Sequence, residues 1–588
     1  MRKHCGSTDF GLQGAAKPRA LPALRITRAL FFAALLPFSV TALAQTPADR
    51  DLLRDRQQKL LEDQRQKLEQ LKQLPGERAP ERPVEAPAEA GRCIDIAHIS
   101  IEGAHLMTEA RQRALVAPFE GRCLETAQFN ELLKAFTQYY LDRGYITTRA
   151  YLPEQDLSSG ELKILIIEGQ LQKIERGENA PSTREIYMSL PGGEGDLLNL
   201  RPLEQMLDQL GRLPSRQAKI DIVPGTETGQ SNIKLEGEAQ KSWRVSLARD
   251  NSGQKSTGRQ QWRTSIYWDS PLGLADQLIL IGGRDADTQK WRRSNNQSIH
   301  YGVPYGWWTF SYAYSRNYYQ AENEAPGLGF SFKTDGTSNT HQLRAERILH
   351  RDATSKTGAS AGLSHMRSRN YFEGELLEVS SQHLSELQIG VNHGRRIGGA
   401  FVNLDLGWQR GVGMLDAQGR GHPHGSEPDA HYNKYTLAIS YLHPFTLKEQ
   451  PFSFESLAYG QHTRDALFSL QRFGLGGLSS VRGFDEQLIT GNSGGYWRNQ
   501  LRWRHNPGWE TLRRYVETFS VALGYDTGAI ARNKRTGDGF ESLSGAALEL
   551  TAQGKNLVAS LTLARALDKP RAIHGGEMPV YFSVGLTY

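Results

Sequence analysis

Alternation of apolar with small or polar residues runs through the C-terminal part of this chain, residues 242–588. The segments 402–408, 435–441 and 519–525 each place aliphatic or aromatic residues on one face and small or polar residues on the other. Successive side chains of a strand point to opposite faces of a sheet, so this period of two predicts β-strands with one apolar face. We therefore expect this region to be built of strands.

Such strands could form a soluble sandwich or a membrane barrel, and the composition of their faces favours the barrel. A sandwich needs a second sheet over each apolar face. Aromatic residues stand at strand ends, as in the interfacial girdles of membrane barrels, and the polar face holds many small residues that suit a water-filled lumen. At roughly 20 residues per strand and turn, the region holds about 16 antiparallel strands. We predict a membrane β-barrel over residues 242–588.

Residues 1–44 are predicted to be an export signal. Arg25 and Arg28 precede an apolar core over residues 29–42, and an A-x-A cleavage site lies at residues 42–44. A membrane anchor is the alternative, but the core is short and lacks a second charged flank.

Export also governs the interpretation of the cysteines. Of the 3 cysteines, Cys5 lies in the predicted signal, which leaves Cys93 and Cys123. An even pair in an oxidising compartment predicts a disulfide, which would close a loop of about 30 residues and stabilise the fold by about 3–4 kcal/mol. Two free buried thiols are the alternative. No His and Cys residues stand at zinc-ligand spacing, so no metal site is expected.

Residues 45–74 read as a mostly polar helix with a narrow stripe of leucines, and Pro75-Gly76 ends it. A short coiled coil is the alternative, although Lys67 interrupts the heptad. Residues 75–92 are rich in proline, alanine and charge, which predicts a flexible linker.

Two small modules of the same βααββ order are predicted over residues 93–169 and 170–241. For the first we expect one irregular strand over 94–101, helices over 108–119 and 127–143, and strands over 150–153 and 161–168. For the second we expect a strand over 171–175, helices over 183–190 and 200–212, and strands over 218–223 and 231–238. The order repeats at a period of about 75 residues. Open sheet edges in such modules can accept an extended peptide.

Several function classes find no support in the chain. The net charge of +6 comes from 70 basic and 64 acidic residues that are well mixed, so no nucleic-acid partner is expected. No G-x-x-x-x-G-K-[ST] motif is present. Residues 358–362 match G-x-S-x-G, but the run continues with strand alternation and no helix follows, so the serine lacks the required elbow. We expect neither an enzyme nor a cofactor.

The most informative motif is Val481-Arg482-Gly483-Phe484, which follows the glycine-rich run 473–480. An arginine at the tip of a flexible loop is costly to order unless its guanidinium meets a carboxylate. We predict that the loop around residues 471–495 folds into the barrel. A solvent-exposed loop charge is the alternative.

Strand register identifies a candidate partner for Arg482. Phe519, Val521, Leu523 and Tyr525 share the apolar face, so Asp526 points into the lumen, near the predicted end of its strand. A solvated turn residue is the alternative for Asp526. Because both groups are expected to be wet, we assign no large stability to the pair.

This order of parts resembles the two-partner secretion transporters, the outer-membrane proteins that secrete hemolysins and filamentous hemagglutinin. The resemblance covers a signal peptide, a polar helix, a linker, two modules and a barrel with Val-Arg-Gly-Phe. It also includes Asp142-Arg143-Gly144-Tyr145-Ile146-Thr147, Asp250-Asn251-Ser252-Gly253 and Ser270-Pro271-Leu272-Gly273-Leu274. In that family the modules are periplasmic POTRA domains.

The resemblance implies a location in the bacterial outer membrane, among its lipids, and transport of a large exported partner protein: an adhesin, a hemolysin or a contact-dependent toxin. It implies that Arg482 and Asp526 fasten the inward loop and that the N-terminal helix plugs the barrel. It further implies that the barrel-assembly machinery recognises the last strand, with Phe582, Val584, Leu586 and Tyr588 on one face. The alternative is a barrel-assembly factor that inserts other outer-membrane proteins.

Overall fold

The computed structural model describes residues 47–74, 93–238, 240–287, 291–324, 329–419, 428–485, 488–508, 510–570, 573 and 578–588. The predicted signal over residues 1–44 and the predicted linker over residues 75–92 lie outside the described residues. None of the helices found in the described ranges combines the length and the apolar character that crossing a membrane requires.

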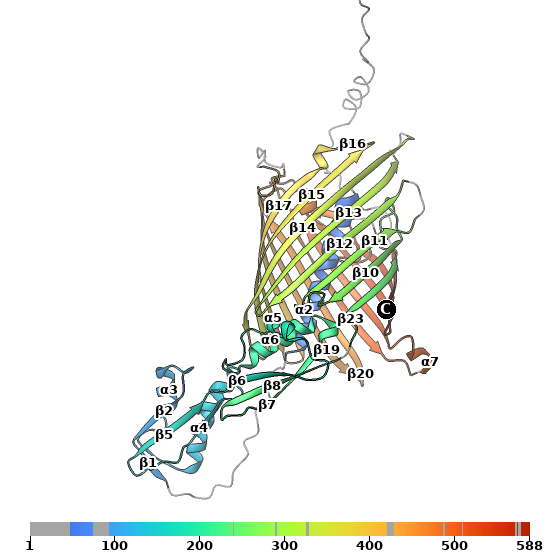
Figure 1. Ribbon diagram of the computed structural model, residues 1–588. Helices are drawn as coiled ribbons and strands as arrows, with labels where there is room; N and C mark the ends of the chain where they lie inside the picture. The colour runs from blue at the N-terminus through green and yellow to red at the C-terminus, as the bar shows by residue number, and fades with distance from the viewer. Residues whose placement is uncertain are drawn as a thin grey trace, which may run out of the picture. The chain divides into compact units, whose positions relative to one another are not determined.

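A closed antiparallel barrel dominates the fold, and the part of the chain that the structure describes contributes sixteen long strands to its wall (Figure 1). The strands are β9 (Trp243–Asp250), β10 (Gln261–Asp269), β11 (Gln277–Asp285), β12 (Arg293–Tyr305), β13 (Trp308–Glu324), β14 (Ser331–Arg351), β15 (Ser355–Phe372), β17 (Gln382–Ile397), β18 (Ala400–Val412), β19 (Asn433–Leu447), β20 (Gln450–Thr463), β23 (Gly494–His505), β24 (Thr518–Ile530), β25 (Glu541–Gln553), β26 (Leu557–Asp568) and β27 (Val580–Thr587). The short β16 (Glu375–Leu376) only extends the hairpin, since β15 pairs directly with β17. The predicted barrel of about 16 strands is confirmed.

Alternation along each strand decides which side chains face the lumen. On β24, Leu523 is 60% exposed on the outer surface, whereas Ala522 is 1% exposed and Asp526 is fully buried on the inner one. The barrel closes where β27 pairs with β9, with Leu586 opposite Leu247. Closure leaves no unpaired sheet edge, which a membrane does not tolerate.

The first N-terminal module contains α3 (Glu109–Val116), α4 (Thr126–Asp142) and the strands β2 (His98–Glu102), β5 (Glu161–Ile167) and β4 (Arg149–Tyr151), paired in the order β2-β5-β4. The predicted single strand over residues 94–101 is wrong. The backbone N–H groups of Ala97 and His98 both donate to the Gly160 carbonyl. This splits the segment into β1 (Ile94–Ile96), which pairs with β3 (Arg122–Leu124), and β2. A disulfide joins Cys93 to Cys123 beside the β1–β3 pair, with the Cα atoms 5.3 Å apart.

The second module packs α5 (Thr183–Ser189) and α6 (Leu200–Gly211) against β6 (Gln170–Arg176), β8 (Gln230–Gly237) and β7 (Ala218–Pro224). Ser182 and Glu185 form a capping box at the start of α5, as the serine followed by a glutamate three residues later favours. The helices and strands agree with the predicted ranges to within one or two residues. Their apolar faces meet in a core with Met206, Leu210 and Ile233 at its centre.

An ion-pair cluster attaches the second module to the barrel at the β14–β15 turn. Arg351 of β14 contacts Glu204 of α6 at 3.0 Å and also Asp208, and Lys356 of β15 lies 3.1 Å from Asp208. Burial by itself raises the pKa of Asp208, but the charges of Lys356 and Arg351 outweigh it and hold the pKa below its usual value. The end of the barrel at which β14 stops and β15 begins is therefore the end that contacts the second module.

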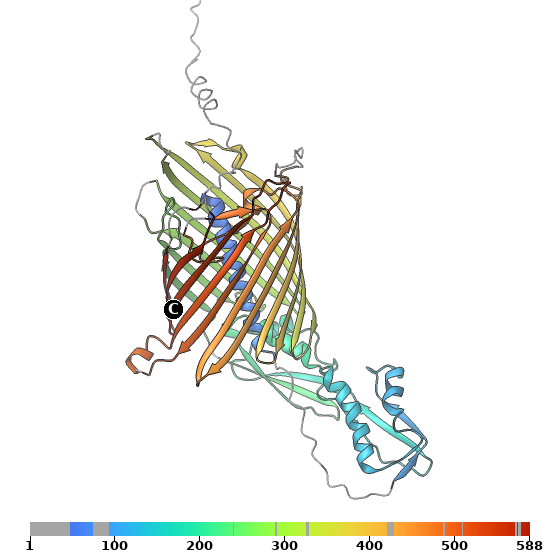
Figure 2. The same ribbon diagram turned by 180° about the vertical axis from the view of Figure 1, so that it is seen from behind.

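Helix α2 (Pro47–Lys72) runs inside the barrel, as both views show (Figures 1 and 2). Leu68 and Leu71 near its C-terminal end, and Leu74 just after it, pack on Phe401 of β18 and Leu442 of β19. The coiled-coil alternative is therefore wrong, because the leucine stripe faces the barrel wall and not a second helix. Lys67, which interrupts the heptad, forms an ion pair with Asp405 of β18.

Candidate functional site

The loop between β20 and β23 lies within the barrel and carries the Val-Arg-Gly-Phe motif. It contains the short turn η3 (Ser469–Gln471) and the strands β21 (Phe473–Leu475) and β22 (Ile489–Gly491), which pair with each other. Gly476 and Gly477 follow β21 with positive φ angles of 123° and 92°, a backbone conformation that favours glycine. The glycine-rich run thus makes the turn that brings the motif to the wall.

Arg482 and Asp526 form a bidentate ion pair at the tip of this loop. The Nε atom of Arg482 donates to Oδ2 of Asp526 at 2.6 Å and a terminal nitrogen donates to Oδ1 at 2.7 Å. The backbone N–H of Arg482 also donates to Oδ2, at 3.1 Å. The other terminal nitrogen donates to Oε1 of Gln500 at 3.1 Å. The side chains of Arg482 and Asp526 are only 1% and 0% exposed.

Glycines of the barrel wall make room for this contact, and the sequence analysis did not identify them. A Cβ on Gly524 would lie 2.1 Å from the Arg482 guanidinium, and one on Gly545 would lie 1.8 Å from the Arg482 carbonyl oxygen. Gly483 has a φ of 104°, and a Cβ there would meet the backbone of β26 at 2.6 Å. Gly524 is two residues from Asp526 on the same strand face, so period-two register could have singled it out.

An apolar shell surrounds the pair. Val481 and Phe484 are buried in one cluster with Leu475, Ile530 and Leu543. The expectation of a wet pair is therefore wrong, because the loop itself excludes water. The assignment of no large net stability to the pair stays a prediction. Removing one partner of a buried ion pair costs about 3–5 kcal/mol, well above the value of a surface pair.

Asp526 also differs from its predicted place along the strand. β24 continues past it to Ile530, because Thr527 and Gly528 pair with β25 and do not turn. The lumenal arginines of β23 have separate partners: Arg498 donates to the Leu478 carbonyl at 2.6 Å and Arg502 lies 2.9 Å from Glu549. The lumen around the loop is thus a packed, hydrogen-bonded region.

Helix α2 is held in the lumen by a network centred on Asp405 of β18. Asp405 accepts hydrogen bonds from Gln64 and Lys67 of the helix, each at 2.5 Å. Gln64 also accepts from Asn403 at 3.0 Å and from Ser440 at 2.9 Å. These contacts are polar, and both Lys67 and Asp405 are partly exposed.

The helix and the loop also contact each other. Gln57 of α2 donates to the Gly474 carbonyl at 2.6 Å, and Arg56 donates to the Leu470 carbonyl. Leu60 and Leu61 pack against the apolar cluster that contains Val481 and Phe484. The two elements therefore fill the lumen together.

Two further ion pairs fix the loop near its start, at η3, and the sequence analysis missed both. Lys434 of β19 lies 3.2 Å from Glu386 of β17, and its ammonium donates to Gln471 of η3 at 2.7 Å. Arg472 lies 2.8 Å from Asp538. Strand alternation places Lys434 and Glu386 on lumenal faces, but pairing them requires knowing which strands adjoin the loop.

The last strand places its predicted residues as alternation requires. Val584, Leu586 and Tyr588 are exposed on the outer surface, and Phe582 is half-buried on the same face. The Tyr588 ring lies under the ammonium of Lys241, 4.0 Å from its centroid, next to Trp243. Tyr588 and Val245 exchange both backbone hydrogen bonds, which seals this end of the closing seam.

The site offers no arrangement for catalysis. Ser360 lies within β15, and the strand continues beyond it to Phe372, so the serine has no elbow. Within the described ranges, no three His, Cys, Asp or Glu side chains gather closely enough to hold a metal ion.

Sequence profiles of three families match the chain. The profile described as haemolysin secretion/activation protein ShlB/FhaC/HecB matches residues 229–552. A ShlB-type POTRA domain matches residues 94–169, and a second POTRA profile matches residues 171–224. Barrel and modules thus match the profiles of one kind of protein.

The chain is similar to named transporters over nearly its whole length. It is 34% identical to the outer membrane transporter CdiB of Dickeya dadantii (strain 3937), over 94% of this chain and 97% of that protein. It is 31% identical to the hemolysin transporter protein ShlB of Serratia marcescens, over 86% and 87% of the two chains. Among solved structures, CdiB from Escherichia coli is similar at a TM-score of 0.85 and 31% identity, covering 93% of this chain and 100% of that one.

Proposed function

This chain belongs to the ShlB/FhaC/HecB haemolysin secretion/activation family of two-partner secretion transporters, and we propose that α2 and the inward loop are two separately held obstructions in its protein-conducting lumen. Membership of this family confirms the resemblance drawn from the sequence. Family membership also favours the interpretation as a transporter and excludes the alternatives of a barrel-assembly factor and an enzyme. The barrel lies in the outer membrane and the POTRA domains lie in the periplasm.

The observation that carries the proposal is the filled lumen. A polypeptide cannot pass while α2 contacts β18, β19 and the loop at once. The contacts of α2 with Asp405 are polar and partly exposed, so water can replace them when the helix leaves. We infer that α2 is the plug that withdraws.

The loop plays a different part in the proposal. Arg482 and Asp526 act as the fastener that keeps the loop against β23 and β24, with Val481, Gly483 and Phe484 fitting the loop tip to the wall. Support comes from the bidentate geometry and the complete burial of the pair. Such a pair holds one geometry well and is costly to separate.

Recognition of the transported protein is assigned to the POTRA domains, which we place at residues 93–169 and 170–241, before the barrel at 242–588. The edge strand β4 carries the exposed Tyr151, and Leu152 follows it. An extended segment could pair with this edge through its backbone and place a side chain against Tyr151 on one face and the next one against Leu152 on the other.

The transported partner is proposed to be a large secreted protein that crosses unfolded: a hemolysin, an adhesin or a contact-dependent toxin. Relatives of this chain are named hemolysin transporters, which supports the first of these. No nucleotide-binding motif is present, so folding outside the cell would supply the direction of transport. The last strand, with Phe582, Val584, Leu586 and Tyr588, is proposed as the signal for the barrel-assembly machinery.

Trapping α2 tests the plug. The hydroxyl of Ser440 lies 2.9 Å from Oε1 of Gln64, so cysteines at these two positions lie within reach of a short dithiol-specific cross-linker that contains a reducible bond and would hold the helix in place. We expect cross-linked protein to secrete little partner and reduced protein to recover secretion. Gln58→Cys with Glu62→Cys, both on the helix and in contact, is the matched control for the cross-linker. Normal secretion by protein cross-linked between residues 64 and 440 would refute withdrawal of the helix.

Removing residues 93–240 tests recognition. The barrel should still reach the outer membrane, because its strands pair only with each other, while secretion of the partner should be lost. Continued secretion would sink the assignment of recognition to the POTRA domains. Depletion of the whole protein should remove one secreted protein and leave the other outer-membrane proteins at normal levels.

A further inference from the structure

The outer wall of β13, β14, β15 and β17 changes abruptly from apolar to basic. On β15 the outward residue Leu363 is followed by His365, Arg367 and Arg369. On the neighbouring strands the outward residues change from apolar to polar or basic beside the same positions. Tyr314 pairs with His341, His341 with His365, and Arg367 with His383. We call the outward residues Arg316, His341, His365, Arg367, Arg369 and His383 the basic patch.

The basic patch lies at the outer interface of the membrane. The β14–β15 turn is at the periplasmic end, because Arg351 contacts the second POTRA domain there. His365 is ten residues beyond Ser355 along β15. At ~3.3 Å per residue and a tilt of ~40°, this is a height of about 25 Å, which equals the apolar band of such barrels. The patch therefore begins where the headgroups of the outer leaflet begin.

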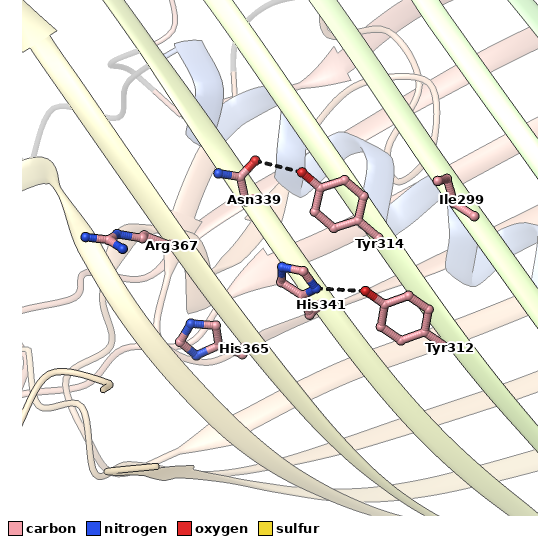
Figure 3. Close-up of a pocket in the computed structure, with 7 residues that line it drawn as sticks. All are labelled: Ile299, Tyr312, Tyr314, Asn339, His341, His365 and Arg367. Atoms are coloured by element: carbon pink, nitrogen blue, oxygen red, sulfur yellow. Dashed lines mark hydrogen bonds between the residues drawn. The ribbon is translucent and has the colours of Figure 1, made fainter. Parts of the chain in front are cut away.

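A depression of about 480 Å³ lies at the centre of the patch (Figure 3). The Tyr314 hydroxyl donates to Oδ1 of Asn339 at 3.3 Å, and the Tyr312 hydroxyl lies 2.9 Å from Nδ1 of His341. These contacts orient the two side chains and leave Nδ2 of Asn339 and Nε2 of His341 for a ligand. Arg367 and His365 border the same depression from the adjacent strand.

The charge of the patch is largely uncompensated. No side chain that lines the depression is acidic. Among the described residues, Arg316, Arg367 and Arg369 have no ion-pair partner, and His383 lies 3.9 Å from Asp416, whose side chain is 94% exposed. The nearest carboxylates farther out on this outer face, beyond the row of Arg369, are Asp335, opposite Tyr371, and Glu322, opposite Lys333. Guanidinium groups with free donors match the oxygens of phosphate.

An apolar depression of about 300 Å³ adjoins the first and shares Ile299 and Tyr314 with it. It extends over β10–β12 and is lined by Ile266 and Leu280. In Figure 1 these strands slope so that a row across them descends from β15 towards β10. The apolar depression therefore lies deeper in the membrane than the basic one. A free anion would gain nothing from these apolar side chains, whereas an acyl chain can pack against them.

We propose that the basic patch and the adjoining apolar depression bind a phosphorylated glycolipid of the outer leaflet, of the lipid A class. Arg367, Asn339 and His341 contact a phosphate at the headgroup level. An acyl chain runs over Tyr314 and Ile299 onto Leu280. Such a ligand would anchor β13–β15 in the outer leaflet.

The proposal is tested on the mature full-length chain by native mass spectrometry after incubation with diphosphorylated lipid A. Arg367→Gln combined with Arg316→Gln should lower the lipid A retained per barrel by about tenfold, the effect of losing one charge-assisted hydrogen bond or more. Arg347→Gln is the matched control. Arg347 lies on β14 at the opposite interface, 5.2 Å from the Trp308 ring centre, and should leave retention unchanged.

Three comparisons complete the test. Fully dephosphorylated lipid A should bind less well than the diphosphorylated form, and millimolar inorganic phosphate should not displace the bound lipid. Leu280→Asn should weaken lipid A binding without changing the heat-modifiable migration of the folded barrel. Equal retention by the Arg367 and Arg316 variant, equal binding of the dephosphorylated lipid, or complete displacement by phosphate would each overturn the proposal.

Discussion

The two elements inside the barrel are held by different chemistry. The loop is fixed at its tip by a buried, bidentate ion pair and by glycines that admit it against the wall. Helix α2 is fixed by hydrogen bonds to Asp405, by Lys67 and by a leucine stripe at its C-terminal end. Burial makes the loop contact costly to break, whereas the partial exposure of Lys67 and Asp405 lets water replace their ion pair when the helix leaves. The same lumen thus holds one element firmly and one reversibly.

The largest effect should come from Asp526→Ala. It leaves the Arg482 guanidinium buried without its carboxylate, so loop opening should become about 3–5 kcal/mol easier. Hydrogen exchange of residues 473–484 measures this, because exchange reports local opening. Arg482→Ala should have a similar effect, and the double variant should not be additive. Secretion should fall while insertion persists, because a loop no longer fastened against β23 and β24 can move across the passage that α2 leaves.

The matched control for Asp526→Ala is Glu346→Ala. Glu346 pairs with Arg344 at 3.4 Å in the same lumen, but their side chains are 37% and 41% exposed. Glu346→Ala should change the free energy of loop opening by no more than about 1 kcal/mol. Equal effects of the two substitutions would mean that burial is not what distinguishes the loop.

Asp208→Asn tests whether breaking a buried ion pair is also costly outside the lumen, at the junction between the second POTRA domain and the barrel. The substitution weakens the contacts of Asp208 with Arg351 and Lys356 and should loosen the POTRA–barrel junction by about 1.5–3 kcal/mol. Spin labels on α6 and on the β14–β15 turn would measure the change in their distance distribution. An unchanged distribution would mean that the junction does not depend on the ion pairs.

The depressed pKa of Asp208 adds a pH dependence to the same junction. A carboxyl with a lowered folded-state pKa contributes stability above the unfolded value of about 4, and that stability is lost as the pH falls through the folded-state value. The junction should therefore hold at pH 5 and loosen only below about pH 4. Loosening between pH 5 and pH 6 would contradict the lowered pKa.

Comparing Gly483→Ala with Gly477→Ala separates the cost of a steric clash from the cost of a positive φ in the loop. Its added Cβ would meet the β26 backbone, and its φ of 104° is strained for alanine, so the loop should lose about 1–3 kcal/mol or more. Gly477→Ala has a similar φ of 92° but open space around the new Cβ. The difference between the two variants, measured by hydrogen exchange, gives the cost of the clash alone.

The smallest effect is expected for the helix. Asp405→Asn removes a partly exposed ion pair with Lys67 and should make α2 leave more easily by about 1 kcal/mol, roughly fivefold in open time. Single-channel conductance measures this. Glu69→Gln is the control, since its partner Lys72 lies on the helix itself. An effect as large as that of Asp526→Ala would erase the distinction between helix and loop.

Local periodicity was sufficient to predict much of the architecture. The barrel strands, the helices of both modules and the lumenal direction of Asp526 follow from the spacing of apolar residues. Prediction failed at residues 94–101, where the apolar alternation shifts phase between Ile96 and Ile99, at the break between β1 and β2. The break depends on a distant residue: the carbonyl of Gly160 accepts hydrogen bonds from the backbone N–H groups of both Ala97 and His98.

The sequence by itself determined the order of the parts, the faces of the strands and the pairing of Arg482 with Asp526 as a candidate. The tertiary structure alone decided that this pair is dry, that Gly524 and Gly545 admit it, and that Lys67 meets Asp405. The basic patch on the outer wall also arises from register across four strands. Period and composition are local properties, whereas burial, close approach and cross-strand neighbours depend on which distant segments the closed barrel brings together.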